Sequence, residues 1–199
     1  MQGTEVRTNI KFAQTVNKVL KAFYWAGIAA LLLVVLLGLF ALFGPDRYFA
    51  AERYARYTFT FELNGIIRYH PDPEQVAGGS LRGLFRSIAL GAAVYVLFFL
   101  YLLRRLRQVM DTVAAQKPFY RGNSKRIHEI GRAVLASAFL IPGANSFVAW
   151  KMIRTFNLSE LSILYTPDLK LAFTGLLLLI LAWVFDYGGY LQEEMDQTV

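Results

Sequence analysis

The sequence contains no cysteine and only two histidines in 199 residues. The absence of cysteine excludes a disulfide framework, a thiolate nucleophile and a metal site with cysteine ligands. His70 and His128 are too few and too far apart in the chain to form a metal site by themselves. The motifs H-E-x-x-H, G-x-S-x-G and G-x-x-x-x-G-K, typical of metalloproteases, serine hydrolases and P-loop proteins, are also missing. We therefore expect no metal, no cofactor and no enzymatic activity.

Charge is scarce as well, at 18% of the residues, whereas hydrophobic residues make up 56%. The longest uncharged run, residues 22–44, exceeds the roughly 20 apolar residues that a helix needs to cross a bilayer core. This run is too long for the apolar region of a secretory signal, so we expect it to persist as a helix. Three shorter uncharged runs follow it, and each needs flanking residues to reach the length of a span. The fold class that we predict is an all-α membrane protein with four transmembrane helices, at about 22–44, 86–107, 127–153 and 168–187.

The net charge of +7 is distributed unevenly along the chain. Segment 104–132 holds eight basic and two acidic residues, whereas the segment between the first two runs is nearly balanced. Because basic residues near span ends are retained in the cytoplasm, we expect both termini to be cytoplasmic. The chain then forms a single domain, 1–199, with an extracytoplasmic loop at 45–86, a basic cytoplasmic linker at 108–126 and an acidic cytoplasmic tail at 188–199.

The phrase KPFYRGNSKRI, residues 117–127, is the most basic part of the linker. In the first interpretation, its basic residues orient the chain in the membrane and are attracted to anionic lipid headgroups. Each basic residue near the surface contributes about 1 kcal/mol to that attraction. A protein partner is the second interpretation. Direct binding of nucleic acid is not expected, because the pattern of aromatic residues on which bases would stack is missing.

The outward loop contains YTFTFELNGIIRYH, in which aromatic and β-branched residues flank Asn64-Gly65. This pattern predicts a small extracytoplasmic β-hairpin at about 57–69. A strict two-residue turn would set Arg68 opposite Phe61. The later segment SILYTP, residues 162–167, could add a strand and so complete a small cap, since a lone hairpin is marginally stable in water.

The third run is interrupted by Pro142 and Gly143. Proline inside a helix removes a backbone hydrogen bond, so we expect a kink there. Asn145 and Ser146 form a polar cluster beside it, and we expect them to bond to the freed backbone groups, with a ligand or gating role as the alternative. Small residues spaced four apart favour close helix packing. They are Ala22, Ala26 and Ala30 in the first run and Ala133 with Ser137 in the third.

The acidic tail is opposite in charge to the linker and is expected on the same membrane face. A contact between tail and linker, or competition between them for a partner, follows from this complementarity. Within the linker, Pro118 and Phe119 can break the preceding helix, and Asn123 is placed to cap the next one. The candidate partner-binding residues are Pro118, Phe119, Arg121, Asn123, Lys125, Arg126, Glu193, Glu194 and Asp196.

Two phrases, KPFYRGNSKRIHEIG at 117–131 and FDYGGYLQEEMDQTV at 185–199, carry a family resemblance. Together they resemble the linker and closing motifs of a bacterial four-span membrane family, known as domain of unknown function 2975. Gln116, Tyr120 and Gln197 depart from the family pattern, which has a glycine, a small hydroxyl residue and a leucine there. The matching positions are Pro118, Phe119, Asn123, Arg126, Ile127, Gly131, Gly188, Leu191, Glu193, Asp196, Thr198 and Val199.

The resemblance implies a location in the bacterial cytoplasmic (inner) membrane. It also implies a partner, because members of the family are often encoded beside a small helix-turn-helix regulator. We therefore expect a non-enzymatic membrane sensor or regulatory partner that restrains or releases a cytosolic transcription factor. The alternatives are an oligomeric transporter or channel component, with Pro142 and Asn145 lining a path, and an assembly subunit of a larger membrane complex.

Overall fold

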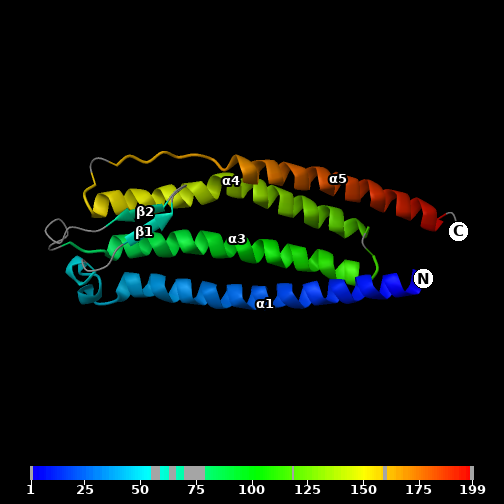
Figure 1. Ribbon diagram of the computed structural model, residues 1–199, viewed down its shortest axis with the longest axis horizontal. Helices are drawn as coiled ribbons and strands as arrows, with labels where there is room; N and C mark the ends of the chain where they lie inside the picture. Colours follow the sequence, from blue (N-terminus) through cyan, green and yellow to red (C-terminus); the bar gives the residue numbers. More distant parts are fainter. Residues whose placement is uncertain are drawn as a thin grey trace. The chain divides into compact units, whose positions relative to one another are not determined.

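The computed structural model describes residues 2–54, 59–62, 66–69, 79–117, 119–158 and 161–197. The described residues are helical apart from one pair of short strands and the connecting segments (Figure 1). Two 3₁₀ helices, η1 (Asp46–Tyr48) and η2 (Ala51–Arg53), follow the first long helix. The long helices are α1 (Gln2–Phe43), α3 (Arg82–Ala114), α4 (Arg121–Thr155) and α5 (Leu169–Gln197).

Each of these long helices contains a segment long and apolar enough to cross a membrane. Their surfaces carry large apolar side chains, such as Leu36 and Phe173, which are 65% and 62% exposed and so require an apolar solvent. The prediction of four membrane-crossing helices is therefore confirmed, and the chain is a multi-pass membrane protein. The four segments are Ala13–Phe43, Arg82–Ala114, Gly122–Thr155 and Leu169–Met195.

The helices are longer than the runs that predicted them. Helix α1 includes the polar arm before residue 22, and α5 continues to Gln197, so the predicted tail is helical through that residue. Helix α3 ends at Ala114 and α4 begins at Arg121, so few residues connect them. Hydropathy detects the part of a helix that lies in lipid, and polar turns that extend it carry no such signal. Helix α4 continues through Pro142 without ending, and the kink there stays a prediction.

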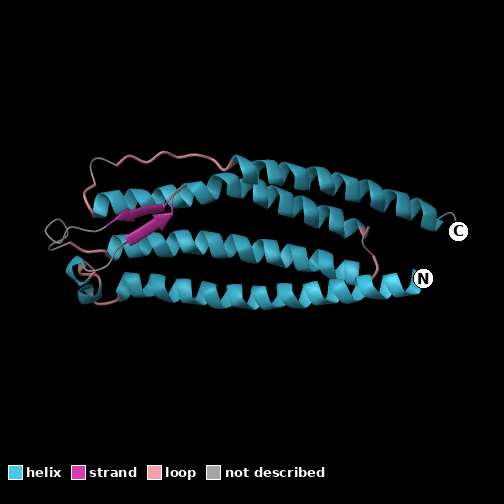
Figure 2. Cartoon of the chain, in the orientation of Figure 1, coloured by secondary structure: helices cyan, strands magenta, loops and turns pink. Residues whose placement is uncertain are grey.

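Strands β1 (Phe59–Glu62) and β2 (Ile66–Tyr69) pair antiparallel (Figure 2). Phe61 lies opposite Ile67 and Glu62 opposite Ile66, so three residues separate the last pair. The register expected from a two-residue turn, with Arg68 opposite Phe61, is therefore wrong by one residue. The turn itself, residues 63–65, lies outside the described residues, and the hairpin of residues 57–69 stays a prediction.

The strand expected at 162–167 is wrong, because residues 161–168 form neither strand nor helix. This segment leads into α5, whose first turn is capped by Asp168. Its Oδ1 accepts hydrogen bonds from the backbone N–H groups of Lys170 (3.0 Å) and Leu171 (3.1 Å). Such bonds satisfy donors that a helix start leaves without partners.

The chain divides into two compact units. The terminal unit comprises residues 1–29, 96–139 and 168–199, in which sequence-adjacent helices meet at glycines. A Cβ at Gly27 of α1 would lie 2.7 Å from Leu100 Cδ2 of α3, and one at Gly175 of α5 would lie 2.7 Å from the Leu135 nitrogen of α4. The expected packing role of Ala22, Ala26 and Ala30 is wrong, since all three are exposed and Gly27 is buried.

The loop unit comprises residues 30–95 and 140–167. Its core consists of five buried side chains. They come from η2, from the start of α3 and the residue before it, and from the end of α4 and the residue after it. Two arginines near the start of α3 donate hydrogen bonds to backbone carbonyl groups at the C-terminal end of α1. Arg82 donates to the backbone oxygens of Leu42 (3.0 Å) and Gly44 (2.6 Å), and Arg86 donates to that of Ala41 (3.0 Å). The core residues are Ala51, Leu81, Leu84, Met152 and Phe156.

Candidate functional site

The connection between α3 and α4 begins with a fixed helix end. The N–H of Lys117 donates to the Thr112 oxygen (2.9 Å) and that of Gln116 to the Val113 oxygen (3.0 Å), which is the Schellman pattern. Gln116 has a φ of 60°, in the left-handed region that glycine adopts most easily. The positive φ explains why the family pattern has a glycine at this position. In this chain Gln116 adopts the same conformation, and both Schellman bonds form.

Asn123 is fully buried in the first turn of α4 and links this helix to α3. Its Nδ2 donates to Thr112 Oγ1 at the end of α3 (2.6 Å). Its Oδ1 accepts from Arg126 Nη1 (3.0 Å), which also donates to the backbone oxygen of Gln108 (2.7 Å). The expectation that Asn123 caps α4 is wrong, because the helix begins two residues earlier. Asn123 and Arg126 instead join the two helices that flank the connection.

Phe119 connects the two phrases of the family resemblance. Its ring lies 5.5 Å, centroid to centroid, from the ring of Phe185 on α5. A Cβ at Gly188 would lie 2.8 Å from Phe119 Cδ1, so a side chain there would displace the ring. Phe119 of the linker thus packs against Phe185 and beside Gly188 on α5, an aromatic contact that the charge argument did not predict. Pairing of the acidic tail residues with the basic linker residues stays a prediction.

The basic residues of the terminal unit fall into two groups. One group faces the chain itself: Arg105 pairs with Glu129 (2.9 Å), the Arg107 guanidinium lies 5.5 Å from the Tyr24 ring, and Arg126 bonds as described above. Lys117 and Lys125 belong to the second group, whose side chains are exposed. The side chain of Arg121, like Pro118 as a whole, lies outside the described residues.

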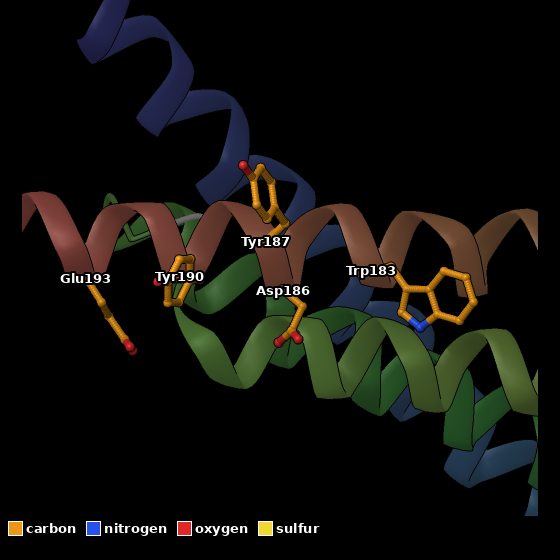
Figure 3. A pocket seen from close by; sticks show the side chains of 5 residues that line it. All are labelled: Trp183, Asp186, Tyr187, Tyr190 and Glu193. Atoms are coloured by element: carbon orange, nitrogen blue, oxygen red, sulfur yellow. The ribbon is translucent and has the colours of Figure 1, made fainter.

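The C-terminal part of α5 presents aromatic and acidic side chains around a shallow hollow of about 550 Å³ (Figure 3). Tyr190 donates from its hydroxyl to Glu194 Oε1 on the same helix. Sequence reasoning selected Glu193 and Glu194 but missed their aromatic neighbours, although spacings of three and four residues would have placed them on one helix face. The side chain of Asp196 is not described. The lining residues are Trp183, Asp186, Tyr187, Tyr190 and Glu193.

The intramembrane cluster on α4 has a partner on the neighbouring helix of the loop unit. Tyr95 of α3 donates from its hydroxyl to Asn145 Oδ1 (2.8 Å), whereas Asn145 was expected to bond to the backbone freed by Pro142. A Cβ at Gly143 would come no closer than 4.0 Å to the Tyr165 ring, and Ser146 is half-buried. The contact joins two helices. A path-lining role for Pro142 and Asn145 stays a prediction.

Among the described residues, no three histidine, aspartate or glutamate side chains are grouped so as to hold a metal ion. The contacts described above place the candidate site at the connection between α3 and α4. It belongs to a multi-pass membrane protein in which a short, fixed connection between two spans packs against the end of the last span.

The chain belongs to the family described as protein of unknown function (DUF2975), whose model matches residues 49–199. The matched region contains both phrases on which the resemblance depended, so the family prediction is confirmed. Helix α1 lies before the matched region. No curated protein and no solved structure matches the chain significantly.

Proposed function

We propose that this chain is a non-enzymatic membrane partner of a small cytosolic helix-turn-helix regulator, in the cytoplasmic membrane of a bacterium. The regulator binds the linker surface, which we define as Lys117, Phe119 and Tyr120. Both termini and the linker face the cytoplasm in this proposal. The density of basic residues between α3 and α4 supports that orientation, because such residues are retained on the cytoplasmic side.

The observation that carries the proposal is the fixed path of the connection. A linker that served orientation alone would need charge but no defined conformation. Here the Schellman bonds fix the connection where it leaves α3, and the buried Asn123 fixes it where α4 begins. Between these ends, Phe119 contacts Gly188 of α5. A surface ordered before binding loses less conformational entropy on association.

The exposed side chains of this segment have the composition of an interaction surface. Tyr120 is 52% exposed, Phe119 is 43% exposed and Lys117 is exposed beside them. Aromatic residues are enriched where protein partners bind, and a basic residue at the rim selects a partner of opposite charge. Asn123 and Arg126 hold this surface in place and do not themselves contact the regulator.

The test is co-purification of the full-length protein with the helix-turn-helix regulator in a mild detergent. The variant Lys117→Glu with Tyr120→Ala is expected to lose most of the recovered regulator, because it reverses the charge and removes the exposed ring. Lys170→Glu is the matched control, since Lys170 is an exposed lysine at the start of α5. Equal recovery from all three proteins would contradict the proposal.

A further inference from the structure

One face of α4 carries basic residues that lie apart from the linker surface. Lys125 and Arg132 are seven residues apart, which places them within about 20° of each other around the helix axis. His128 lies between them on the same side. The opposite side of α4 is buried in the terminal unit, and both basic side chains are exposed. The buried residues on that side of α4 include Asn123, Ile127, Val134 and Ala138.

The neighbouring charges of α4 are directed elsewhere. Glu129 pairs with Arg105 of α3, and Arg126 bonds to Gln108 and Asn123. Lys125 and Arg132, by contrast, form no hydrogen bond or ion pair with any side chain that the structure describes. Glu129 lies on the same side of α4 as Lys125 and Arg132, but its carboxylate pairs with Arg105 of α3. Lys125 and Arg132 are thus the two exposed cations here for which the described residues supply no anion.

The depth of these two cations follows from the length of the span. The helical segment Gly122–Thr155, which contains the third span, has 34 residues, or about 51 Å of helix, against a hydrocarbon core of about 30 Å. A centred helix therefore extends about 10 Å beyond the core at each end. Lys125, about 4.5 Å from the start of the segment, lies in the headgroup layer, and Arg132, about 15 Å from it, lies just below the edge of the core.

A guanidinium at the depth of Arg132 is costly unless it extends toward the interface or pairs with an anion. From there it reaches the same layer in which Lys125 lies. A phosphate group placed between the two would be contacted from both sides, and an arginine can bind it through two parallel hydrogen bonds. A soluble acidic protein would have to penetrate the headgroup layer to contact both cations, whereas a lipid phosphate already lies in that layer.

We propose that Lys125 and Arg132 form a binding site for the phosphate of an anionic membrane phospholipid. The site does not require the regulator, and the regulator surface does not require the lipid. Each basic residue near an anionic surface contributes about 1 kcal/mol, which is roughly five-fold in affinity. Removal of both is therefore expected to weaken binding of the lipid roughly 30-fold.

The experiment is a titration of the full-length protein with phosphatidylglycerol in detergent, followed by native mass spectrometry. Lys125→Ala with Arg132→Ala is expected to show the weakened binding, and Lys125→Arg with Arg132→Lys is expected to retain it. Lys170→Ala is the control for loss of an exposed cation. Equal apparent unfolding temperatures in detergent supplemented with phosphatidylcholine verify that the double variant is folded.

Three results would overturn the proposal. The first is binding of phosphatidylglycerol by the folded double variant as tightly as by the parent. The second is displacement of the lipid by an equal concentration of inorganic phosphate, which would identify a general phosphate site. The third is a dimer that the double variant loses while lipid binding stays unchanged, which would identify this face as an interface between two copies of the chain.

Discussion

Glycine residues determine where α4 and α5 approach each other in the terminal unit. A Cβ at Gly175 would lie 2.7 Å from the backbone nitrogen of Leu135, and one at Gly131 would lie 3.0 Å from that of Leu179. In both cases a backbone atom is among the nearest neighbours, and it cannot move aside as a flexible side chain can. Close contact of this kind is how helices associate in lipid, where burial of apolar surface gives no driving force.

Gly175→Ala is expected to lower the free energy of unfolding by about 1–3 kcal/mol, because the added methyl group forces α4 and α5 apart. Gly83→Ala is the matched control, since a Cβ there meets nothing within 4 Å. Thermal unfolding in detergent, followed by circular dichroism, measures both. A Gly175→Ala protein as stable as Gly83→Ala would contradict the close contact.

Asn123 is the second residue whose loss should be costly, because it is fully buried and bonded to two side chains. Asn123→Ala removes one partner of Thr112 and one partner of Arg126, and we expect destabilisation by about 1–3 kcal/mol. A double-mutant cycle with Thr112→Val isolates the bond between the two residues. Strictly additive effects would show that the hydrogen bond contributes nothing.

At the scale of the element, the Schellman motif that ends α3 has glutamine at the position where glycine is the most stable residue. Gln116 occupies the left-handed position of the Schellman pattern at a φ of 60°. Gln116→Gly is therefore expected to raise stability by up to about 1 kcal/mol, whereas Gln14→Gly, inside α1, should lower it by about 1 kcal/mol. Unfolding temperatures of the two variants that shift in the same direction would contradict this assignment.

The C-terminus of α1 depends on Arg82, which bonds to two backbone oxygens and to Asp46 Oδ1 (2.6 Å). The Asp46 side chain is 92% exposed, so this ion pair contributes little. We expect Asp46→Asn to cost less than about 1 kcal/mol and Arg82→Ala to cost more, because the latter leaves helix-end carbonyl groups without a partner. Chemical denaturation of both proteins measures the difference. Equal losses would show that the carbonyl contacts are unimportant.

The sequence could predict the spans because hydropathy reports which part of a helix lies in lipid. It could not predict contacts between helices, which depend on which face turns inward. The small-residue rule selected Ala22, but the helix turns Gly27 toward α3. The linker motif likewise pointed to Asn123 as an end cap, and its bonds to Thr112 and Arg126 become apparent only when α3 and α4 are placed side by side.

For the whole molecule, the family match and the four apolar helices establish a multi-pass membrane protein, and the candidate site lies at one connection in the terminal unit. The two family phrases are distant in sequence yet meet at Phe119 and Gly188. The central claim is that the ordered connection between α3 and α4 binds a cytosolic protein.

Site-specific photo-crosslinking in intact bacterial cells tests this claim most directly. A photoreactive amino acid replaces Tyr120 in one protein and Leu164, which is 85% exposed, in the other. We expect the protein labelled at position 120 to form a covalent adduct with a helix-turn-helix regulator, identified by mass spectrometry, and the protein labelled at 164 to form none with it. Absence of that adduct at position 120, or equal adducts at both positions, would contradict the account.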